Sequence, residues 1–251
     1  MRIYFKGPYI DDNRLPHEEI AKHPDATKFK EFENTHAFLL GINLLSFLLL
    51  GMFALIYHKI SGLHNISITG VAMVMLAIIP HEYIHASWFK RKAYVYTHKY
   101  AVMITGTEPM SKKRFILMCL TPSIIFGFIP FLAYLIHPEY RILGTLGGIT
   151  LPMCLGDFYN IYNCYKQVPD DGYCFMSKQN TYWFIPEKAR LTRRLRPTII
   201  DRLYAFVSIV TIAFIWICGL YGQECLGLAL QAIIYEWAAY SFIAYMQIQD
   251  Y

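Results

Sequence analysis

The sequence predicts an all-α polytopic membrane protein with about six transmembrane helices and a small cytoplasmic β-hairpin region. The composition is the first observation: 55% of the residues are hydrophobic and only 16% are charged, against about 25% charged residues in soluble domains. The second observation is a series of apolar runs of about 20 residues, the length that crosses a bilayer as a helix. These runs are Ala37–Tyr57, Ile66–Phe89, Phe115–Ile136, Ile142–Tyr165, Leu203–Tyr221 and Cys225–Gln247.

The third observation is the distribution of basic residues between the runs. Lysine and arginine number 6 before the first run, 7 between the second and third, and 8 between the fourth and fifth, so that 21 of the 23 fall in alternate segments. Because cytoplasmic segments are enriched in lysine and arginine, these three segments and both termini are predicted to be cytoplasmic. The net charge of +5 therefore reflects topology, and it gives no indication of a nucleic-acid partner.

The same pattern divides the chain into three parts. Residues 1–36 form a cytoplasmic N-terminal segment, residues 37–186 a membrane core, and residues 187–251 a basic linker with a C-terminal helical hairpin. Within the core, the β-branched and aromatic stretch Tyr94–Thr105 predicts one β-hairpin, and Tyr173–Pro186 predicts a second. The six cysteines form no C-x-x-C pair and most lie in apolar runs, so no disulfide framework is expected.

The second apolar run ends in a motif of ionisable residues, Pro80-His81-Glu82-Tyr83-Ile84-His85. This is the H-E-x-x-H pattern of zinc hydrolases. On a helix, residues i and i+4 share one face, so His81 and His85 can reach one metal ion. Ionisable side chains within a bilayer are costly and are usually functional. The motif therefore predicts a metal site inside the membrane core.

A catalytic zinc ion takes three protein ligands and keeps one position open for water, so a third ligand is required. The third histidine of one soluble pattern is replaced here by Arg91. Glu108 and Glu139 lie in predicted loops, and Glu236 lies in the middle of the last apolar run. Asp157, in contrast, lies inside the fourth apolar run, where its depth in the membrane can match that of the motif.

Depth favours Asp157 as the third ligand. His81 precedes Lys90 by nine residues, and Asp157 precedes Lys166 by the same number. This interval is about 13 Å along a helix. Equal depth is what a shared metal ion requires. A role for Asp157 as a hydrogen-bonded packing group is the alternative.

The fourth run also carries features that argue against a regular helix. Three glycines and a proline precede Asp157, namely Gly144, Gly147, Gly148 and Pro152. Small residues allow helices to approach closely and proline kinks a helix, so both tight packing and a broken element that admits water are consistent with this composition. Two neighbours of Asp157 are further candidates: Cys154 as a softer metal ligand, and Asn160 as a group that orients a ligand or only packs.

Taken together, these motifs resemble a known family. The chain resembles the bacterial membrane zincin peptidases in four motifs: Pro-His-Glu-x-x-His in one run, Thr121-Pro122 in the next, then Gly156-Asp157 and Pro169-Asp170-Asp171. The arrangement of the motifs is also similar to that of the site-2 intramembrane metalloproteases. The resemblance covers about Ser67 to Pro186. The sequence departs from the site-2 pattern, which carries a longer Asn/Pro-rich motif before its Asp-Gly, so the substrate class stays open.

The resemblance implies a Zn²⁺ ion bound by His81, His85 and Asp157, with Glu82 as the catalytic base. The expected function is a zinc-dependent intramembrane or juxtamembrane peptidase that hydrolyses peptide bonds of membrane-associated substrates. Its expected partners are a membrane protein or peptide substrate and the lipid bilayer, with the chain as a multi-pass protein of the cell membrane.

Two other classes of function compete with this interpretation. In a transporter, His81, Glu82 and Asp157 would form an ion or proton relay, but no internal repeat is visible, and transporters usually have one. In a non-catalytic metal-binding scaffold, a fourth ligand such as Cys154 would close the site. The hairpin after the motif has two interpretations as well: an exposed strand that pairs with substrate, or a hairpin closed on itself.

Overall fold

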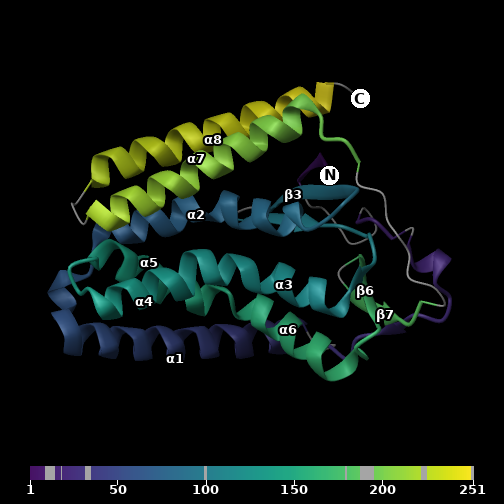
Figure 1. Cartoon of the computed structure of the whole chain (residues 1–251), viewed down its shortest axis with the longest axis horizontal. Helices are drawn as coiled ribbons and strands as arrows, with labels where there is room; N and C mark the ends of the chain where they lie inside the picture. The colour runs from purple at the N-terminus through teal and green to yellow at the C-terminus, as the bar shows by residue number, and fades with distance from the viewer. Residues whose placement is uncertain are drawn as a thin grey trace.

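The computed structural model describes residues 1–8, 15–17, 19–31, 35–98, 101–178, 180–186, 195–221 and 225–249. Most of these residues are helical, and the helices lie side by side along the long axis of the molecule with the strands gathered at one end (Figure 1). The helices are α1 (Thr35–Ser61), α2 (Ile68–Ser87), α3 (Lys112–Ser123), α4 (Ile129–Ile136), α5 (Arg141–Met153), α6 (Leu155–Gln167), α7 (Ile199–Tyr221) and α8 (Leu226–Gln249).

Within the described part of the chain, five helical segments are long and apolar enough to cross a membrane, or six if the bent pair α5–α6 forms one span. The third of these segments combines α3 and α4, which are joined by a π-helical stretch, Ile124–Phe128. Large apolar side chains face outward on several helices; Leu40 and Phe47 of α1 are 73% and 70% exposed. Soluble monomers rarely expose apolar surface on this scale, so the arrangement is compatible with a multi-pass membrane protein.

Two small sheets join segments that are distant in sequence. The first has the order β1 (Arg2–Pro8), β3 (Lys92–His98), β4 (Ala101–Thr105), with β1 parallel and β4 antiparallel to β3. The second has the order β2 (Thr27–Lys28), β7 (Asn180–Phe184), β6 (Tyr173–Ser177), β5 (Met110–Ser111), and all of its pairs are antiparallel.

The sheets confirm both predicted hairpins, which are β3–β4 and β6–β7. They also bring together strands from the N-terminal segment, from the segment after α2 and from the segment after α6. These are the three segments that carry most of the basic residues, and the structure therefore places them at the same end of the molecule (Figure 1).

The fourth apolar run is broken, as its composition indicated. Helices α5 and α6 are bent by 51° at Cys154, two residues after Pro152. Close packing is present too: a Cβ added at Gly147 would lie 2.6 Å from the backbone of Gly127 and of Phe131, so α4 and α5 lie in contact here. The bend gives α6 a direction of its own and places Asp157 in its first turn.

Candidate metal centre

The two histidines of the motif face each other from one side of α2. Their Nε2 atoms lie 3.1 Å apart, and their ring centroids are 4.8 Å apart. This is the arrangement that the i, i+4 spacing predicts for a helix. Both side chains are partly exposed, His81 at 20% and His85 at 13%, so a small ion or molecule has access to them.

Asp157 completes the group from the first turn of α6. One carboxylate oxygen, Oδ2, lies 3.4 Å from Nε2 of His81, and the other, Oδ1, lies 3.4 Å from Nε2 of His85. Two imidazole nitrogens and a carboxylate directed at one point are a donor set that suits Zn²⁺. The residues present therefore fit a metal ion. His81 and Asp157, which were expected to lie near each other because of their equal depth, do lie close together.

The orientation of His85 is set by the neighbouring helix α3. Its Nδ1 atom lies 3.1 Å from the backbone carbonyl oxygen of Met118. Pro122, four residues further along α3, has no N–H with which to bond that carbonyl in the helical pattern. The Thr121-Pro122 motif thus leaves the Met118 carbonyl available as an acceptor for Nδ1–H, which directs Nε2 toward Asp157. Metal-binding histidines are commonly held in this way by a backbone carbonyl.

Glu82 lies between the two histidines in sequence, but its side chain contacts strand β4. Its Oε2 atom accepts a hydrogen bond of 3.2 Å from the backbone N–H of Ile104 on β4. Sequence reasoning missed this contact and the Met118 contact, because a backbone group carries no residue signature. The absence of an N–H at Pro122 was the one sequence signal that could have revealed the contact between His85 and the Met118 carbonyl.

Cys154 lies next to the group, at the break between α5 and α6. It is buried, and one ligand atom each of His81, Cys154 and Asp157 lie within 4.8 Å of one another. A cavity of about 330 Å³ opens at this point, and its lining residues are Val74, Ala77, Ile78, His81, Glu82, Val102, Thr150, Met153 and Cys154. Asn160 is half-buried on α6 and makes no hydrogen bond to the histidines or to Glu82 among the described residues.

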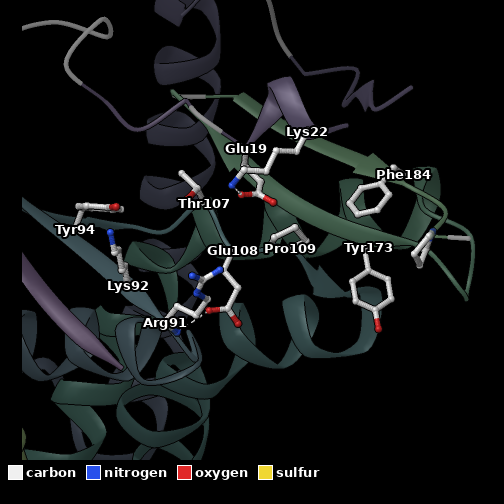
Figure 2. A pocket seen from close by; sticks show the side chains of 11 residues that line it. Glu19, Lys22, Arg91, Lys92, Tyr94, Thr107, Glu108, Pro109, Tyr173 and Phe184 are labelled. Atoms are coloured by element: carbon white, nitrogen blue, oxygen red, sulfur yellow. Dashed lines mark hydrogen bonds and ion pairs between the residues drawn. The ribbon is translucent and has the colours of Figure 1, made fainter. Parts of the chain in front are cut away.

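A second pocket, of about 200 Å³, lies beyond the end of α2 and between the two sheets (Figure 2). It is lined by residues of both charge signs, and Arg91 and Glu108 lie next to each other in it. Oε2 of Glu108 accepts the backbone N–H groups of Lys90 and Arg91, at 2.8 and 2.7 Å. Glu108 therefore fixes the turn that follows α2, and it lies apart from the motif.

The other acidic residues considered from the sequence also lie outside the group. Glu139 pairs with His137 in the connection between α4 and α5, with 3.2 Å between Oε1 and Nδ1. Glu236 is buried on α8, and in the described part of the chain neither of its oxygens has a hydrogen-bond partner. Of the carboxylates considered as a third ligand, Asp157 is the one that the structure brings to both histidines.

Comparison with known proteins gives a family match to part of the chain. Neither a search of the curated proteins nor a search of the solved structures finds a match to the chain. A segment that begins within α2 and ends shortly after α6 does match a family model. Residues 74–171, which contain the H-E-x-x-H motif, Thr121-Pro122 and Gly156-Asp157, match the family described as "Putative zincin peptidase", which confirms the resemblance seen in the sequence.

Proposed function

We propose that the chain is a zinc-dependent peptidase that hydrolyses peptide bonds of membrane-associated substrates, within or beside the bilayer. The observation that carries the proposal is the meeting of His81, His85 and Asp157 beside a cavity that Glu82 also lines. Helices α2 and α6, which carry these residues, belong to the apolar segments of the chain. The family match adds support from the sequence.

His81, His85 and Asp157 would hold the zinc ion, the histidines through Nε2 and the aspartate through its carboxylate. Bound zinc would polarise the peptide carbonyl and lower the pKa of the attacking water. The hydrogen bond from Nδ1 of His85 to Met118 keeps Nε2 free of a proton for this role. The single negative charge of Asp157 offsets part of the charge of a dication in apolar surroundings.

Glu82 would act as the general base and then as the general acid. Its carboxylate would accept a proton from the attacking water and would pass that proton to the nitrogen of the amine that leaves. The cavity beside it is lined mostly by apolar side chains, which favours apolar substrate residues near the bond that is cleaved.

The proposal predicts zinc and hydrolysis in the same preparation. The purified chain in lipid nanodiscs should contain about one zinc ion per molecule, and a degenerate peptide library should yield products that mass spectrometry detects. Removal of the metal with a chelator should stop cleavage, and added zinc should restore it. Protein without bound metal and without products would contradict the proposal.

A non-catalytic metal centre is the second candidate, because the thiol of Cys154 lies close to His81 and Asp157. Structural zinc sites usually have four protein ligands. Cys154→Ser separates the two functions. In a peptidase with three ligands the variant keeps its zinc, whereas in a closed four-ligand site it loses much of the affinity.

The proposed location is the cell membrane with both termini in the cytoplasm. It rests on the 21 basic residues in three alternate segments and on the sheets that unite those segments. A single cysteine in place of Lys178, in the β6–β7 hairpin, should resist a membrane-impermeant reagent added to intact cells. A cysteine in place of Lys59, at the opposite end of α1, should react. The reverse pattern would overturn the orientation.

A further inference from the structure

The pocket of about 200 Å³ between the two sheets is a second place where charged side chains converge (Figure 2). They come from the N-terminal segment, from the stretch that follows α2 and from the connection between β4 and β5. We refer to this site as the inter-sheet pocket, and its charged residues are Glu19, Lys22, Arg91, Lys92 and Glu108. The partners of these five residues decide which sign of charge a ligand must carry.

Both carboxylates of the inter-sheet pocket already have partners. Oε2 of Glu19 lies 2.8 Å from Nζ of Lys22, and Oε1 of Glu19 lies 3.3 Å from Nε2 of His23. Oε2 of Glu108 accepts two backbone N–H groups, and its Oε1 lies 3.7 Å from Nη1 of Arg114. Each of the four oxygens therefore faces a donor, and a cationic ligand would have to compete with these partners.

The side chains of Arg91 and Lys92 are differently placed. Both residues are exposed. Although Glu108 lies next to Arg91, neither the Arg91 guanidinium nor the Lys92 ammonium forms an ion pair with a carboxylate among the described residues. Nζ of Lys92 lies 5.5 Å from the centroid of the Tyr4 ring, which supplies no negative charge. Two positive charges at the pocket thus lack a counter-charge, and they favour a ligand with two negative charges.

The backbone that carries these two cations is fixed on both sides. The Arg91 N–H donates to Glu108 at 2.7 Å, and the Arg91 carbonyl oxygen accepts the N–H of Arg2, also at 2.7 Å. Lys92 pairs with Arg2 in the ladder between β1 and β3. A site on a fixed backbone loses little conformational freedom when a ligand binds, and this favours affinity.

The chemistry of the lining points to a phosphate that is attached to a flat ring. The guanidinium of Arg91 can bind two phosphate oxygens at once, and Lys92 adds a compact positive charge. Three aromatic side chains also line the pocket, namely Tyr94, Tyr173 and Phe184. Aromatic side chains stack on nucleic-acid bases with little regard to sequence. A phosphate monoester carries nearly two negative charges at neutral pH, which matches the two uncompensated cations.

We propose that the inter-sheet pocket binds a nucleoside monophosphate, with the phosphate on Arg91 and Lys92 and the base against the aromatic side chains. This site goes beyond the proposed peptidase function, which requires no nucleotide. A soluble ligand is favoured over a lipid headgroup, because the lining residues lie outside the apolar helical segments. With about 200 Å³, the pocket would enclose part of the ligand and leave the rest in solvent.

Calorimetric titration of the chain in phosphatidylcholine nanodiscs tests the ligand class. The probe is adenosine 5′-monophosphate, and inorganic phosphate and adenosine represent its two halves. The probe should bind at least about ten-fold more tightly than either half, because each half makes only part of the contacts. Its affinity should fall as the salt concentration rises, since the contact joins opposite charges near the surface.

Three variants and a matched control test the residues. Arg91→Gln keeps the backbone bonds of the turn and should weaken the probe at least about ten-fold, and Arg91→Lys, which keeps the charge without the fork, should lie between it and the wild type. Lys113→Gln, the control, removes an exposed cation of α3 that does not line the pocket, and it should bind like the wild type. Tyr173→Leu should weaken the probe but not inorganic phosphate, and the retained phosphate affinity reports an intact pocket.

The inference is overturned if the probe does not bind, if adenosine binds as tightly as the probe, if Lys113→Gln weakens binding as much as Arg91→Gln, or if Tyr173→Leu binds the probe like the wild type. Nanodiscs that contain phosphatidylglycerol distinguish the source of the phosphate. Undiminished binding there supports a soluble ligand, whereas its complete loss would assign the pocket to a lipid headgroup and would refute the nucleotide. Zinc content and cleavage are measured separately, so failure of this site leaves the proposed function untouched.

Discussion

Two carboxylates in the apolar segments of the chain, Asp157 and Glu236, differ in the groups that surround them. Asp157, on α6, has each oxygen 3.4 Å from a histidine nitrogen. Glu236, on α8, has no hydrogen-bond partner for either oxygen within the described residues, and the Thr211 hydroxyl on α7 lies near it but outside hydrogen-bond geometry. The sequence shows an acidic residue in an apolar run in both places, so the surroundings make the difference.

The comparison shows what distinguishes the candidate metal centre from an isolated carboxylate. Asp157 is met by nitrogen donors on α2 and lies beside a cavity, and one of those donors is held by α3. Glu236 lies in the α7–α8 hairpin, where the neighbouring group is the Thr211 hydroxyl. A carboxylate alone in an apolar environment is a cost to stability, whereas one that compensates a metal ion is part of a site.

The largest expected difference between the two residues is in metal content. Asp157→Ala removes the anionic ligand and leaves two histidines, so it should lose most of its zinc in a mild chelator wash, and with it the hydrolysis. Asp157→Asn should lose less, because the amide oxygen can still coordinate. Elemental analysis of zinc per chain measures both.

Glu236→Ala is the matched control, since it removes the buried carboxyl group of α8. It should keep its zinc, and Cys154→Ser should change the zinc content little. If Asp157→Ala kept full occupancy while Glu236→Ala or Cys154→Ser lost it, Asp157 would not be the third ligand.

The next effect is on turnover with the metal in place. Glu82→Gln should retain zinc, since Glu82 is not one of the proposed ligands, and it should lower the rate of cleavage by about 10²–10⁴-fold, the usual contribution of a general base. The measurement is initial rate against zinc content for the same preparation. Near-native cleavage by Glu82→Gln would exclude Glu82 as the base.

How far the sequence predicts this molecule depends on the kind of contact. The proximity of His81, His85 and Asp157 was predictable, because helical spacing and the distance of a residue from the basic end of its apolar run are properties of the chain itself. The β3–β4 hairpin was predictable from β-branched and aromatic residues. The pairing of β1 with β3 was not, because a parallel partner from the far N-terminus carries no local signal.

The contacts of the site that involve backbone groups were less predictable from the sequence. The bond from Ile104 to Glu82 depends on how β4 lies on α2, which no residue type specifies. The 51° bend at Cys154 was expected in kind from Pro152, but its direction, which places Asp157 against α2, follows from packing of the helices. The sequence therefore indicated which residues to examine, and tertiary packing determined how they meet.

A smaller effect is expected at Pro122, which supports the site from α3. Pro122→Ala restores an N–H that can bond the Met118 carbonyl within the helix, in competition with His85. Zinc affinity should fall by about 10–100-fold, the range seen when a group that orients a ligand is lost. Competition with a fluorescent zinc chelator measures this affinity.

Pro130→Ala provides the comparison for a helix proline away from the site. Pro130 lies in α4, which contributes no proposed ligand and does not form the bend before Asp157. If the two alanine variants weakened zinc to the same extent, a general change of helix packing would account for the result, and the orienting role of Met118 would be wrong.

The smallest effect is expected at Glu236, where removal of the carboxylate should raise the unfolding temperature and leave the zinc content unchanged. Removal of a buried polar group that lacks a partner is neutral or stabilising when an apolar group of similar shape takes its place. Glu236→Met should therefore keep its zinc and its cleavage rate and should raise the unfolding temperature by about 2–4 °C, the shift that about 1 kcal/mol gives in a chain of this size. Asp157→Met, its counterpart, should lose zinc. Thermal unfolding followed by tryptophan fluorescence in nanodiscs, with zinc analysis of the same samples, compares the pair. Loss of zinc in Glu236→Met would mean that the α7–α8 hairpin contributes to the metal centre, and the distinction between the two carboxylates would no longer hold.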